Sequence, residues 1–361
     1  MNKNYYAIIM AGGIGSRFWP ISRTSYPKQF LDILGIGKTL IQNTYDRFLK
    51  ICPKENIYVV TNENYAALVK AQLPDMTDQQ ILTEPVMRNT APCIAYGCFK
   101  IESINPNASI VVAPSDHLIL NEPAFINAIQ KSLEIASKNE CLVTLGIKPS
   151  RPDTGYGYIQ HTDQMLGEDF YKVKTFTEKP TLEIAKTFLQ SGDFLWNAGI
   201  FIWSAGAILK AFNRYLPEIG EIFAEARPVY NTENEKKHIH KAYQQCTNIS
   251  IDYGVMEKAD NVYVLPSEFG WSDLGTWASI YQLAEKDYVG NAVIPSEKVI
   301  MYDSSNCMVN VPGEKLVVLQ GLHDFIVVES NNTLLICPRD QEQNIKQVVA
   351  DVKTKFGAKY I

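Results

Sequence analysis

The segment at residues 7–31, AIIMAGGIGSRFWPISRTSYPKQFL, constrains the fold more than any other part of the chain. The apolar run from Tyr6 to Met10 predicts a buried strand, and a loop rich in glycine follows it. Glycines let the backbone turn tightly and bring its N–H groups against an anion, because no Cβ intervenes. Arg17 adds a forked guanidinium and Lys28 a mobile ammonium, both suited to phosphate oxygens. The segment therefore predicts a polyphosphate-binding loop at the carboxyl end of the first strand of an α/β sheet.

Two common phosphate loops do not match this segment. The Walker loop ends in Gly-Lys-Ser/Thr, whereas Gly15 is followed by Ser16 and Arg17. The dinucleotide-binding loop has a third glycine three places after the second, where this chain has Phe18. Taken alone, the loop also allows a purely structural turn with Arg17 in solvent.

Composition and charge restrict the class of protein. The 361 residues are too many for one ordinary compact domain and fit a large α/β domain plus a smaller module. A formal net charge of −5 disfavours a nucleic-acid-binding surface, which needs a basic face. The sequence shows no secretory segment and no apolar run of bilayer length, so we expect a cytoplasmic protein without a membrane partner. The seven scattered cysteines favour buried free thiols over a zinc site.

The first half of the chain alternates apolar runs with amphipathic stretches, which predicts βαβ units and an α/β fold class. We expect strands at Tyr6–Met10, Ile57–Thr61, Gln80–Thr83, Ser109–Ala113 and Cys141–Gly146. We expect helices near Thr39–Lys50, Ala66–Gln72, Ala91–Ser103 and Pro123–Asn139.

The middle of the chain differs in character. It predicts strands at Tyr156–Gln160 and Tyr171–Thr177 and an exposed amphipathic helix at Leu182–Gln190. The polar segment Glu218–Gln245 predicts a helical lid or a flanking layer, two alternatives that the sequence leaves open.

From Asn291 onward, short β-type runs alternate with turn residues before a final helix at Gln341–Lys355. The runs are Val299–Tyr302, Cys307–Val311, Leu316–Leu319, Phe325–Glu329 and Thr333–Ile336. We therefore predict a large domain over residues 1–287 and a small β-rich C-terminal module, ending in a helix, over residues 288–361.

A longer pattern contains the glycine-rich loop. The string GGIGSRFWPISRTSYPKQFL is similar to the opening motif of the nucleotidyltransferase family of sugar-phosphate nucleotide pyrophosphorylases, in its guanylyltransferase branch. The resemblance continues in chain order through TEPVMRNTAP (83–92), VVAPSDHLI (111–119), TLGIKPSRPDTGYGYI (144–159), FTEKP (176–180), WNAGIF (196–201), SIDYGVMEK (250–258) and GWSDLGTW (270–277). It implies a Rossmann-like mixed sheet flanked by helices, with the catalytic domain over residues 1–287.

Two aspartates are candidate metal ligands. Asp116 follows the apolar run Ser109–Ala113 at the carboxyl end of a strand, where α/β sites are built. Asp273 has apolar bulk beside it from Trp271 and Trp277, and a carboxylate in such surroundings is costly unless a cation or donors pair with it. The structural alternative is capping of a helix or turn for Asp116 and a helix N-cap for Asp273. The resemblance makes Asp116 and Asp273 ligands of Mg²⁺, which prefers oxygen donors.

The resemblance also implies residues around a sugar 1-phosphate. Lys179 is expected to contact its phosphate, and Glu178 to accept hydrogen bonds from its hydroxyls. Both can face one ligand only if the strand ends or twists before Pro180, because adjacent strand residues point to opposite faces. The rest of this sugar-phosphate-binding set is Gly157, Asn197 and Asp252.

The remaining implied site binds the nucleotide. The expected nucleotide-binding residues are Ala11, Gly12, Gly13, Gly15, Ser16, Glu84, Arg88, Asn89, Thr90 and Ser115. The expected catalytic residues are Arg17, Lys28 and Lys179, which would neutralise charge in the transition state.

The implied substrates are GTP and α-D-mannose 1-phosphate, and the implied products are GDP-mannose and pyrophosphate. The sugar phosphate is ionised at neutral pH, so its oxygen can attack the α-phosphorus without a general base. The alternatives are the same chemistry on another sugar 1-phosphate or nucleotide, and a catalytically silent subunit that binds nucleotide sugars. We expect no appended isomerase domain, because His323 alone among the histidines follows Asn291. The β-rich module resembles one often used for dimer contacts, which allows a homodimer.

Overall fold

The computed structural model describes residues 1–294, 298–312 and 314–361, which form two compact units. Unit 1 comprises Met1–Gly12, Thr44–Ser115 and Ile119–Trp271. Unit 2 comprises Gly13–Asn43, Asp116–Leu118 and Ser272–Ile361. These units and the sequence-predicted domains are different divisions of the chain, and the domain boundary at residues 287 and 288 stays a prediction.

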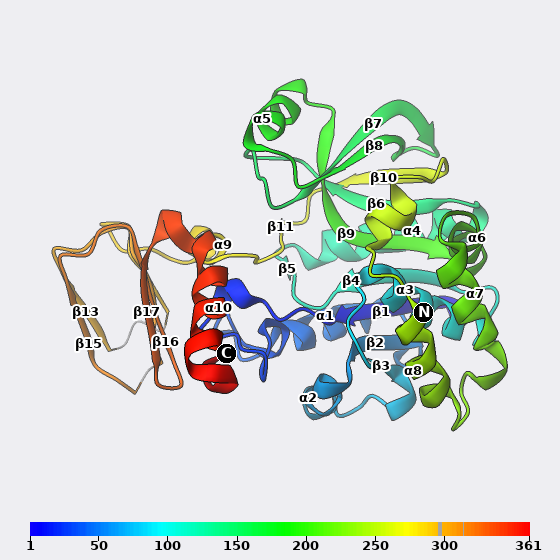
Figure 1. Cartoon of the computed structure of the whole chain (residues 1–361). Helices are drawn as coiled ribbons and strands as arrows, with labels where there is room; N and C mark the ends of the chain where they lie inside the picture. Colours follow the sequence, from blue (N-terminus) through cyan, green and yellow to red (C-terminus); the bar gives the residue numbers. More distant parts are fainter. Residues whose placement is uncertain (295–297, 313) are drawn as a thin grey trace. The chain divides into compact units, whose positions relative to one another are not determined.

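Unit 1 is built on a nine-stranded mixed sheet in the order β3-β2-β1-β4-β9-β6-β10-β8-β7 (Figure 1). Its strands are β1 (Tyr5–Ala11), β2 (Ile57–Asn62), β3 (Ile81–Glu84), β4 (Ser109–Pro114), β6 (Leu142–Ile147), β7 (Gly157–Leu166), β8 (Phe170–Glu178), β9 (Phe194–Ser204) and β10 (Val262–Ser267). The predicted βαβ part is present, because β1 pairs in parallel with β2 and β4, and β2 with β3. Strand β9 runs antiparallel to both β4 and β6 and separates them. The α/β fold class with a mixed sheet is therefore confirmed.

Helices cover this sheet and build its core. They are α1 (Leu40–Phe48), α2 (Ala66–Gln72), α3 (Thr90–Ile104), α4 (Glu122–Lys138), α5 (Leu182–Ser191), α6 (Ala205–Tyr215), α7 (Pro217–Glu225) and α8 (Glu235–Gln245). One core cluster joins Ile8 and Ile110 of the sheet to side chains of α3, α6, α7 and α8. The next residues along those strands, Ile9 and Val111, are also buried, and they face the other way. Both faces of the sheet are therefore covered.

The polar segment Glu218–Gln245 is a flanking layer and not a lid. It contains the helices α7 and α8, and Asn231 between them has a positive φ of 63°. Phe223, Ile239 and Tyr243 are buried in the core cluster that α3 also joins. These buried positions outweigh the polar composition of the exposed positions.

Unit 2 contains the C-terminal strands and the early segment that follows β1. The short strands β5 (Leu118–Ile119) and β11 (Trp271–Ser272) lie where the chain passes from one unit to the other along the sequence. The remaining strands are β12 (Ala292–Ile294), β13 (Val299–Tyr302), β14 (Met308–Asn310), β15 (Val317–Gln320), β16 (Phe325–Ser330) and β17 (Thr333–Pro338). Strands β12, β14 and β16 pair in parallel, as do β13 and β15, while β17 is antiparallel to β16. The predicted β-rich C-terminal region is confirmed.

Two apolar clusters hold unit 2 together. Cys307, Val309 and Val327 are buried with side chains of β13 and β15 packed against them. The helices α9 (Trp277–Leu283) and α10 (Ile345–Phe356) pack with Phe18 and Trp19 of the early segment in the second cluster. Before α10, the chain forms the 3₁₀ segment η8 (Arg339–Asn344), so the predicted final helix begins later than expected. In the part of the chain that the structure describes, no helix is long and apolar enough to span a membrane.

Candidate active site

Gly15 shapes the loop that follows β1. Its backbone is left-handed, with φ 69° and ψ 41°, which an L side chain rarely adopts. A Cβ added at Gly15 would lie 2.5 Å from the Cβ of Lys28, so the lysine side chain passes directly over the glycine. The backbone N–H of Lys28 also donates to the carbonyl of Ile14 at 3.4 Å. Glycine at this position therefore allows Lys28 to lie against the loop.

The ammonium of Lys28 links the two candidate metal ligands within unit 2. Its Nζ donates to Oδ2 of Asp116 at 2.9 Å and to the backbone carbonyl of Asp273 at 2.7 Å. The Lys28 residue is only 3% exposed, and its Nζ lies 5.6 Å from the centre of the Phe18 ring. Burial alone would raise the pKa of Asp116, but the charge of Lys28, with help from His117, outweighs burial and lowers it. Asp116 is therefore held as a carboxylate.

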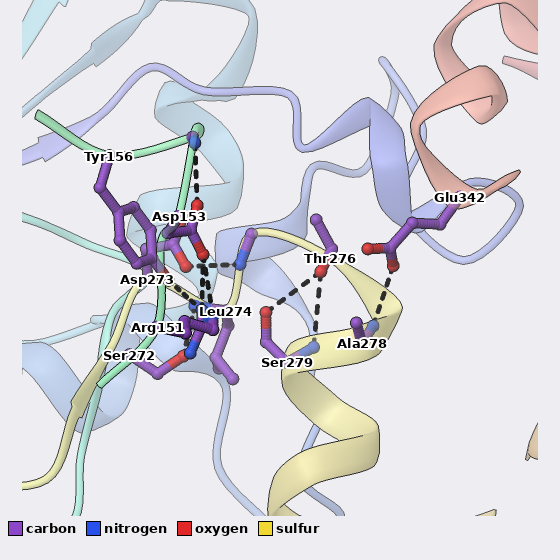
Figure 2. Close-up of polar contacts among 12 residues, drawn as sticks. Arg151, Asp153, Tyr156, Ser272, Asp273, Leu274, Thr276, Ala278, Ser279 and Glu342 are labelled. Carbon is purple, nitrogen blue, oxygen red and sulfur yellow. Dashed lines mark hydrogen bonds and ion pairs between the residues drawn. The ribbon is translucent and has the colours of Figure 1, made fainter. Parts of the chain in front are cut away.

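The loop that carries Asp273 is shaped by its own side chains (Figure 2). Oδ1 of Asp273 accepts the backbone N–H of Gly275 at 2.9 Å, and the hydroxyl of Ser272 accepts that of Leu274 at 3.1 Å. A Cβ at Gly275 would come within 2.4 Å of Oδ2 of Asp273. Leu274 has a positive φ of 44° and is fully buried, which anchors the turn. The helix N-cap that the sequence left open for Asp273 is wrong, because Thr276 caps α9, and Asp273 instead closes the turn before that helix.

The oxygen donors around Lys28 fit a divalent cation that takes further ligands from a substrate. Among residues 1–294, 298–312 and 314–361, no group of three or more His, Cys, Asp or Glu side chains could hold a metal by itself. Mg²⁺ needs no such group, because it binds through one or two carboxylates together with phosphate oxygens and water. Asp116 and Asp273 supply carboxylates of this kind, and the ammonium of Lys28 already binds Oδ2 of Asp116 and the backbone carbonyl of Asp273.

Arg17 and Ser16 lie in the 3₁₀ segment η1 (Ser16–Phe18), directly after Gly15. The Nε of Arg17 donates to Oε1 of Gln343 at 3.0 Å, a contact between residues 326 positions apart. The structural alternative from the sequence, an Arg17 free in solvent, is therefore wrong. Gln343 escaped sequence analysis because a single exposed glutamine in a polar segment carries no recognisable pattern.

In unit 1, the carboxyl ends of β1, β3 and β4 place several expected nucleotide-binding residues. The N–H of Ser115 donates to the carbonyl of Met10 at 3.0 Å, which joins the ends of β4 and β1. Ala11 is the last residue of β1 and is buried, and a Cβ at Gly12 would lie 3.7 Å from Oε2 of Glu84. The structure therefore brings Gly12 and Glu84 together, although they are far apart in the sequence. Gly13 lies in unit 2, and a Cβ there would meet nothing within 4 Å.

Glu84 is a buried carboxyl with an unsatisfied oxygen. The residue is 4% exposed, and its Oε1 has no hydrogen-bond partner within the described residues. Burial raises the pKa of Glu84 to about 7, and the nearby Tyr243 side chain offsets part of that rise. A buried polar atom without a partner is costly, so a ligand that donates hydrogen bonds would be stabilised here.

Arg88, Asn89 and Thr90 support the start of α3. Asn89 has φ 67° and its side chain accepts the N–H of Thr90 at 2.9 Å. The hydroxyl of Thr90 accepts the N–H of Ile251 at 2.9 Å, and Nε of Arg88 donates to the carbonyl of Tyr243 at 3.3 Å. These contacts give the three residues structural roles, and their contacts with a nucleotide stay a prediction.

Glu178 and Lys179 meet the condition for facing one ligand, namely that the strand ends before Pro180. Strand β8 ends at Glu178, and Lys179 has a left-handed φ of 47°. The turn lets Nζ of Lys179 reach Oε1 of Glu178 at 2.7 Å, so both charged groups lie on the same side. Gly157 is the β7 residue paired with Glu178, and a Cβ there would lie 2.5 Å from Oε2 of Glu178. Gly157 therefore keeps the space beside this carboxylate open.

Asn197 and Asp252 complete this cluster in unit 1. Nδ2 of Asn197 donates to Oδ1 of Asp252 at 2.8 Å, and its Oδ1 accepts the hydroxyl of Thr144 at 3.2 Å. Burial, with help from the charge of Glu178, raises the pKa of Asp252 to about 6, against the opposing hydrogen bond from Asn197. The expected sugar-phosphate-binding residues thus gather around one partly buried pair of carboxyl groups.

A further polar network in unit 1 was not singled out by sequence analysis. Arg151 donates from Nη2 to Oδ2 of Asp153 at 2.7 Å, and its guanidinium lies 5.2 Å from the Trp196 ring (Figure 2). The hydroxyl of Tyr158 donates to the carbonyl of Asp153 at 2.9 Å. The network fixes the loop before Gly157. The block TLGIKPSRPDTGYGYI contained these residues, and its charged and aromatic spacing was the available signal.

The site consists of a strand, a glycine loop with two cations, and carboxylates that follow neighbouring strands. These features define a class of protein that transfers nucleotides. A family model described as nucleotidyl transferase matches residues 6–289, and one described as MannoseP isomerase/GMP-like beta-helix domain matches residues 297–352. The chain belongs to the nucleotidyl transferase family and is an enzyme of that class.

Curated relatives extend over nearly the whole chain. A protein named alginate biosynthesis protein AlgA from Pseudomonas aeruginosa is 36% identical over 96% of this chain and 71% of its own length. A protein named mannose-1-phosphate guanylyltransferase from Escherichia coli is 33% identical over 97% of this chain and 76% of its own length. A solved structure from Thermus thermophilus, described as mannose-1-phosphate geranyltransferase, has a TM-score of 0.86 at 29% identity, covering 97% of this chain and 99% of that one.

Proposed function

We propose that this enzyme transfers GMP from GTP to α-D-mannose 1-phosphate, giving GDP-mannose and pyrophosphate. The observation that carries the proposal is the constellation in unit 2, where Lys28 lies over Gly15 and binds both Asp116 and the carbonyl of Asp273. The relative from Escherichia coli that bears the name mannose-1-phosphate guanylyltransferase supports the choice of substrates.

Asp116 and Asp273 are the residues that would hold Mg²⁺, together with phosphate oxygens of the nucleotide. When bound, the ion supplies charge neutralisation and polarisation of the phosphoryl oxygens. Lys28 binds Oδ2 of Asp116 and the backbone carbonyl of Asp273, so its ammonium lies beside both aspartates, where it can also meet the phosphates.

Other residues of the chain bind the two substrates. The backbone of the glycine loop and the guanidinium of Arg17 bind the triphosphate, since both present several N–H donors to phosphate oxygens. Lys179 binds the phosphate of the sugar substrate, and Glu178 and Asn197 bind its hydroxyls. An oxygen of the sugar phosphate forms a new bond to the α-phosphorus, the bond to the β-phosphate oxygen breaks, and pyrophosphate leaves with the electron pair. The attacking oxygen carries no proton at neutral pH, so no group of the protein has to remove one.

Glu84 supports the choice of guanine. The N1 and N2 positions of guanine are hydrogen-bond donors, and Oε1 of Glu84 is a buried acceptor that needs one. We assign Glu84 to the nucleotide-binding set on this basis, with Gly12 beside it.

The test is a substrate panel with pyrophosphate release as the measurement. GTP with mannose 1-phosphate and Mg²⁺ should give the highest kcat/KM among common nucleoside triphosphates and hexose 1-phosphates. Asp116→Ala and Asp273→Ala should each remove most turnover, with far-ultraviolet circular dichroism unchanged. If another pair of substrates has the highest kcat/KM, that pair replaces GTP and mannose 1-phosphate in the proposal. Near-normal kcat in either variant would show that the substituted aspartate is not a metal ligand.

The domain boundary and cell location are further parts of the proposal. The ranges 6–289 and 297–352 matched by the two family models support a catalytic domain at 1–287 and a module at 288–361.

All seven cysteines are free thiols, which supports a reducing, cytoplasmic location. A homodimer is proposed through the module, to be checked by sedimentation.

A further inference from the structure

Two adjacent side chains of η8 reach toward residues of the candidate active site, all within unit 2. Gln343 accepts a hydrogen bond from Arg17, and Glu342 accepts one from the start of α9. Neither residue lies in a motif with a recognised chemical role. Through these two residues, η8 connects the C-terminal strands to the loops that carry Arg17 and Asp273.

Gln343 controls the direction of the Arg17 guanidinium. Within the part of the chain that the structure describes, Oε1 of Gln343 accepts only from Nε of Arg17, at 3.0 Å. A guanidinium has five N–H donors in a planar fork, so a bond at Nε leaves the four donors of the two terminal nitrogens. Because the fork is planar, holding Nε also fixes the plane in which those four donors point. Gln343 therefore orients Arg17 without occupying the nitrogens that bind phosphate bidentately.

Glu342 holds the segment directly after Asp273. Its Oε2 accepts the backbone N–H of Ala278 at 2.9 Å, in the first turn of α9 (Figure 2). The same turn is closed by Thr276, whose hydroxyl accepts the N–H of Ser279 at 3.4 Å. Burial raises the pKa of Glu342, although the N–H of Ala278 and the charge of Arg17 oppose the rise. A fixed start of α9 limits the movement of the Asp273 turn, which precedes it by a few residues.

Other contacts tie the early segment of unit 2 to its C-terminal part. Nε1 of Trp19 donates to the carbonyl of Tyr360 at 2.7 Å. Nη2 of Arg23 donates to the carbonyl of Ser330 at 2.8 Å and to the hydroxyl of Thr333 at 3.0 Å. These anchors lie on both sides of η8 in the sequence, so the position of Gln343 relative to Arg17 is fixed by several independent bonds.

We propose that Gln343 and Glu342 are positioning residues for nucleotidyl transfer: Gln343 orients Arg17 toward the triphosphate, and Glu342 holds the Asp273 turn. The inference rests on the proposed function, because it acts through Arg17 and Asp273. It gives the β-rich C-terminal module a role in catalysis in addition to any role in assembly.

A double-mutant cycle tests whether Gln343 acts through Arg17. In the full-length chain, Gln343→Ala should lower kcat/KM for GTP about tenfold, the loss expected for one hydrogen bond to a charged group. It should leave the KM for mannose 1-phosphate unchanged. In the Arg17→Ala background, Gln343→Ala should have no further effect, because the group it orients is gone. GTP binding measured by calorimetry should show the same non-additivity.

The conservative variant and a matched control separate positioning from folding. Glu342→Gln keeps an oxygen that can accept the Ala278 N–H and should retain activity, whereas Glu342→Ala should lose it. Gln347→Ala removes a glutamine of the neighbouring helix whose side chain, among the described residues, bonds only Asp351, at 3.0 Å, and should leave turnover unchanged. Additive effects of Gln343→Ala and Arg17→Ala, or equal losses in both Glu342 variants, would overturn the inference. If the Arg17→Ala variant turns over normally, both the proposed role of Arg17 and this inference are wrong. The proposed reaction would still hold, provided that the wild-type enzyme turns over GTP and mannose 1-phosphate.

Discussion

At the scale of single residues, the site depends on backbone positions that only particular residues can occupy. Gly15 lies under Lys28 with a left-handed backbone, and Lys179 turns away from its strand at a positive φ. Each of these conformations aims a cation: Lys28 at Asp116, and Lys179 at Glu178. The electrostatics of the site are therefore a consequence of local backbone geometry.

Replacement of Gly15 by alanine tests this dependence. The new Cβ would lie 2.5 Å from Lys28, so the lysine must move away from Asp116. We expect turnover to fall by at least about a hundredfold, since a misplaced catalytic cation is worth several kcal/mol. Stability should fall by more than the cost of a left-handed alanine, about 1–2 kcal/mol, because the buried pair of Lys28 and Asp116 is disturbed as well. Steady-state kinetics and urea unfolding are the measurements.

Gly35 provides the matched control for that variant. Its φ is 68°, close to that of Gly15, but a Cβ there meets nothing within 4 Å. Gly35→Ala should lose only the cost of a left-handed alanine, about 1–2 kcal/mol, with normal turnover. Equal turnover in the two variants would mean that the contact with Lys28 has no catalytic weight.

Asp252 predicts a pH-dependent effect on stability. Its pKa is about 6 in the folded chain, above the ordinary value of 3.8, so its ionisation opposes folding. The destabilisation grows as pH rises from about 4 to above 6 and is then constant, at no more than about 3 kcal/mol. Asp252→Asn removes it, and its amide oxygen can still accept from Asn197. The variant should therefore gain more stability at pH 8 than at pH 4, measured by urea unfolding at both values. A gain that is equal at both values, or a loss at pH 8, would contradict this account.

Sequence reasoning located the charged residues better than it located their supports. Asp116 and Glu178 could be found because each follows a recognisable strand, and their motifs are continuous. Gln343 could not be found, because its contact with Arg17 spans 326 positions and depends on how two loops fold. The unpartnered oxygen of Glu84 is likewise a property of burial, which only the structure shows.

At the scale of elements, a buried ion pair joins helices α3 and α8 in unit 1. Nζ of Lys100 lies 2.7 and 2.6 Å from the two carboxylate oxygens of Glu235, which also accept from the Tyr96 hydroxyl and the N–H of Asn231. The side chains of Lys100 and Glu235 are 3% and 10% exposed. Both helices carry residues close to Glu84, namely Cys93 in α3 and Tyr243 in α8.

Breaking that pair should be strongly destabilising. Glu235→Ala leaves a buried ammonium without its partner, and we expect a loss of about 3–5 kcal/mol in the free energy of unfolding. Lys100→Met combined with Glu235→Leu should restore most of the stability, because no buried charge remains. Lys210→Ala removes an exposed pair with Glu140, and should change stability by less than about 1 kcal/mol. Denaturant unfolding measures all of them, and a Glu235→Ala loss no larger than the Lys210→Ala loss would contradict the role of the pair.

The elements themselves were predicted unevenly. The early strands follow from their apolar runs, because parallel strands buried on both faces are continuous in sequence. The antiparallel insertion of β9 between β4 and β6 was not predicted, since neighbours in a sheet are set by long-range packing. The sequence left a lid and a flanking layer open for Glu218–Gln245, because exposed positions dominate its composition. The burial of Phe223 and Tyr243 decides for the flanking layer.

At the scale of the whole molecule, the two compact units carry different parts of the proposed chemistry. Unit 2 holds Arg17, Lys28, Asp116 and Asp273, and unit 1 holds Glu84, Glu178, Lys179, Asn197 and Asp252. The β-rich C-terminal region belongs to the same unit as the phosphate loop, so it contributes directly to that loop.

The central claim is that an oxygen of the sugar phosphate attacks the α-phosphorus of GTP. Mannose 1-phosphate labelled with ¹⁸O on its non-ester phosphate oxygens, incubated with the enzyme, GTP and Mg²⁺, tests it by ³¹P nuclear magnetic resonance. The account predicts GDP-mannose with ¹⁸O in the bridge between its two phosphorus atoms, so that both resonances shift, together with unlabelled pyrophosphate. Unlabelled oxygen in that bridge, labelled pyrophosphate, or no GDP-mannose at all would contradict it.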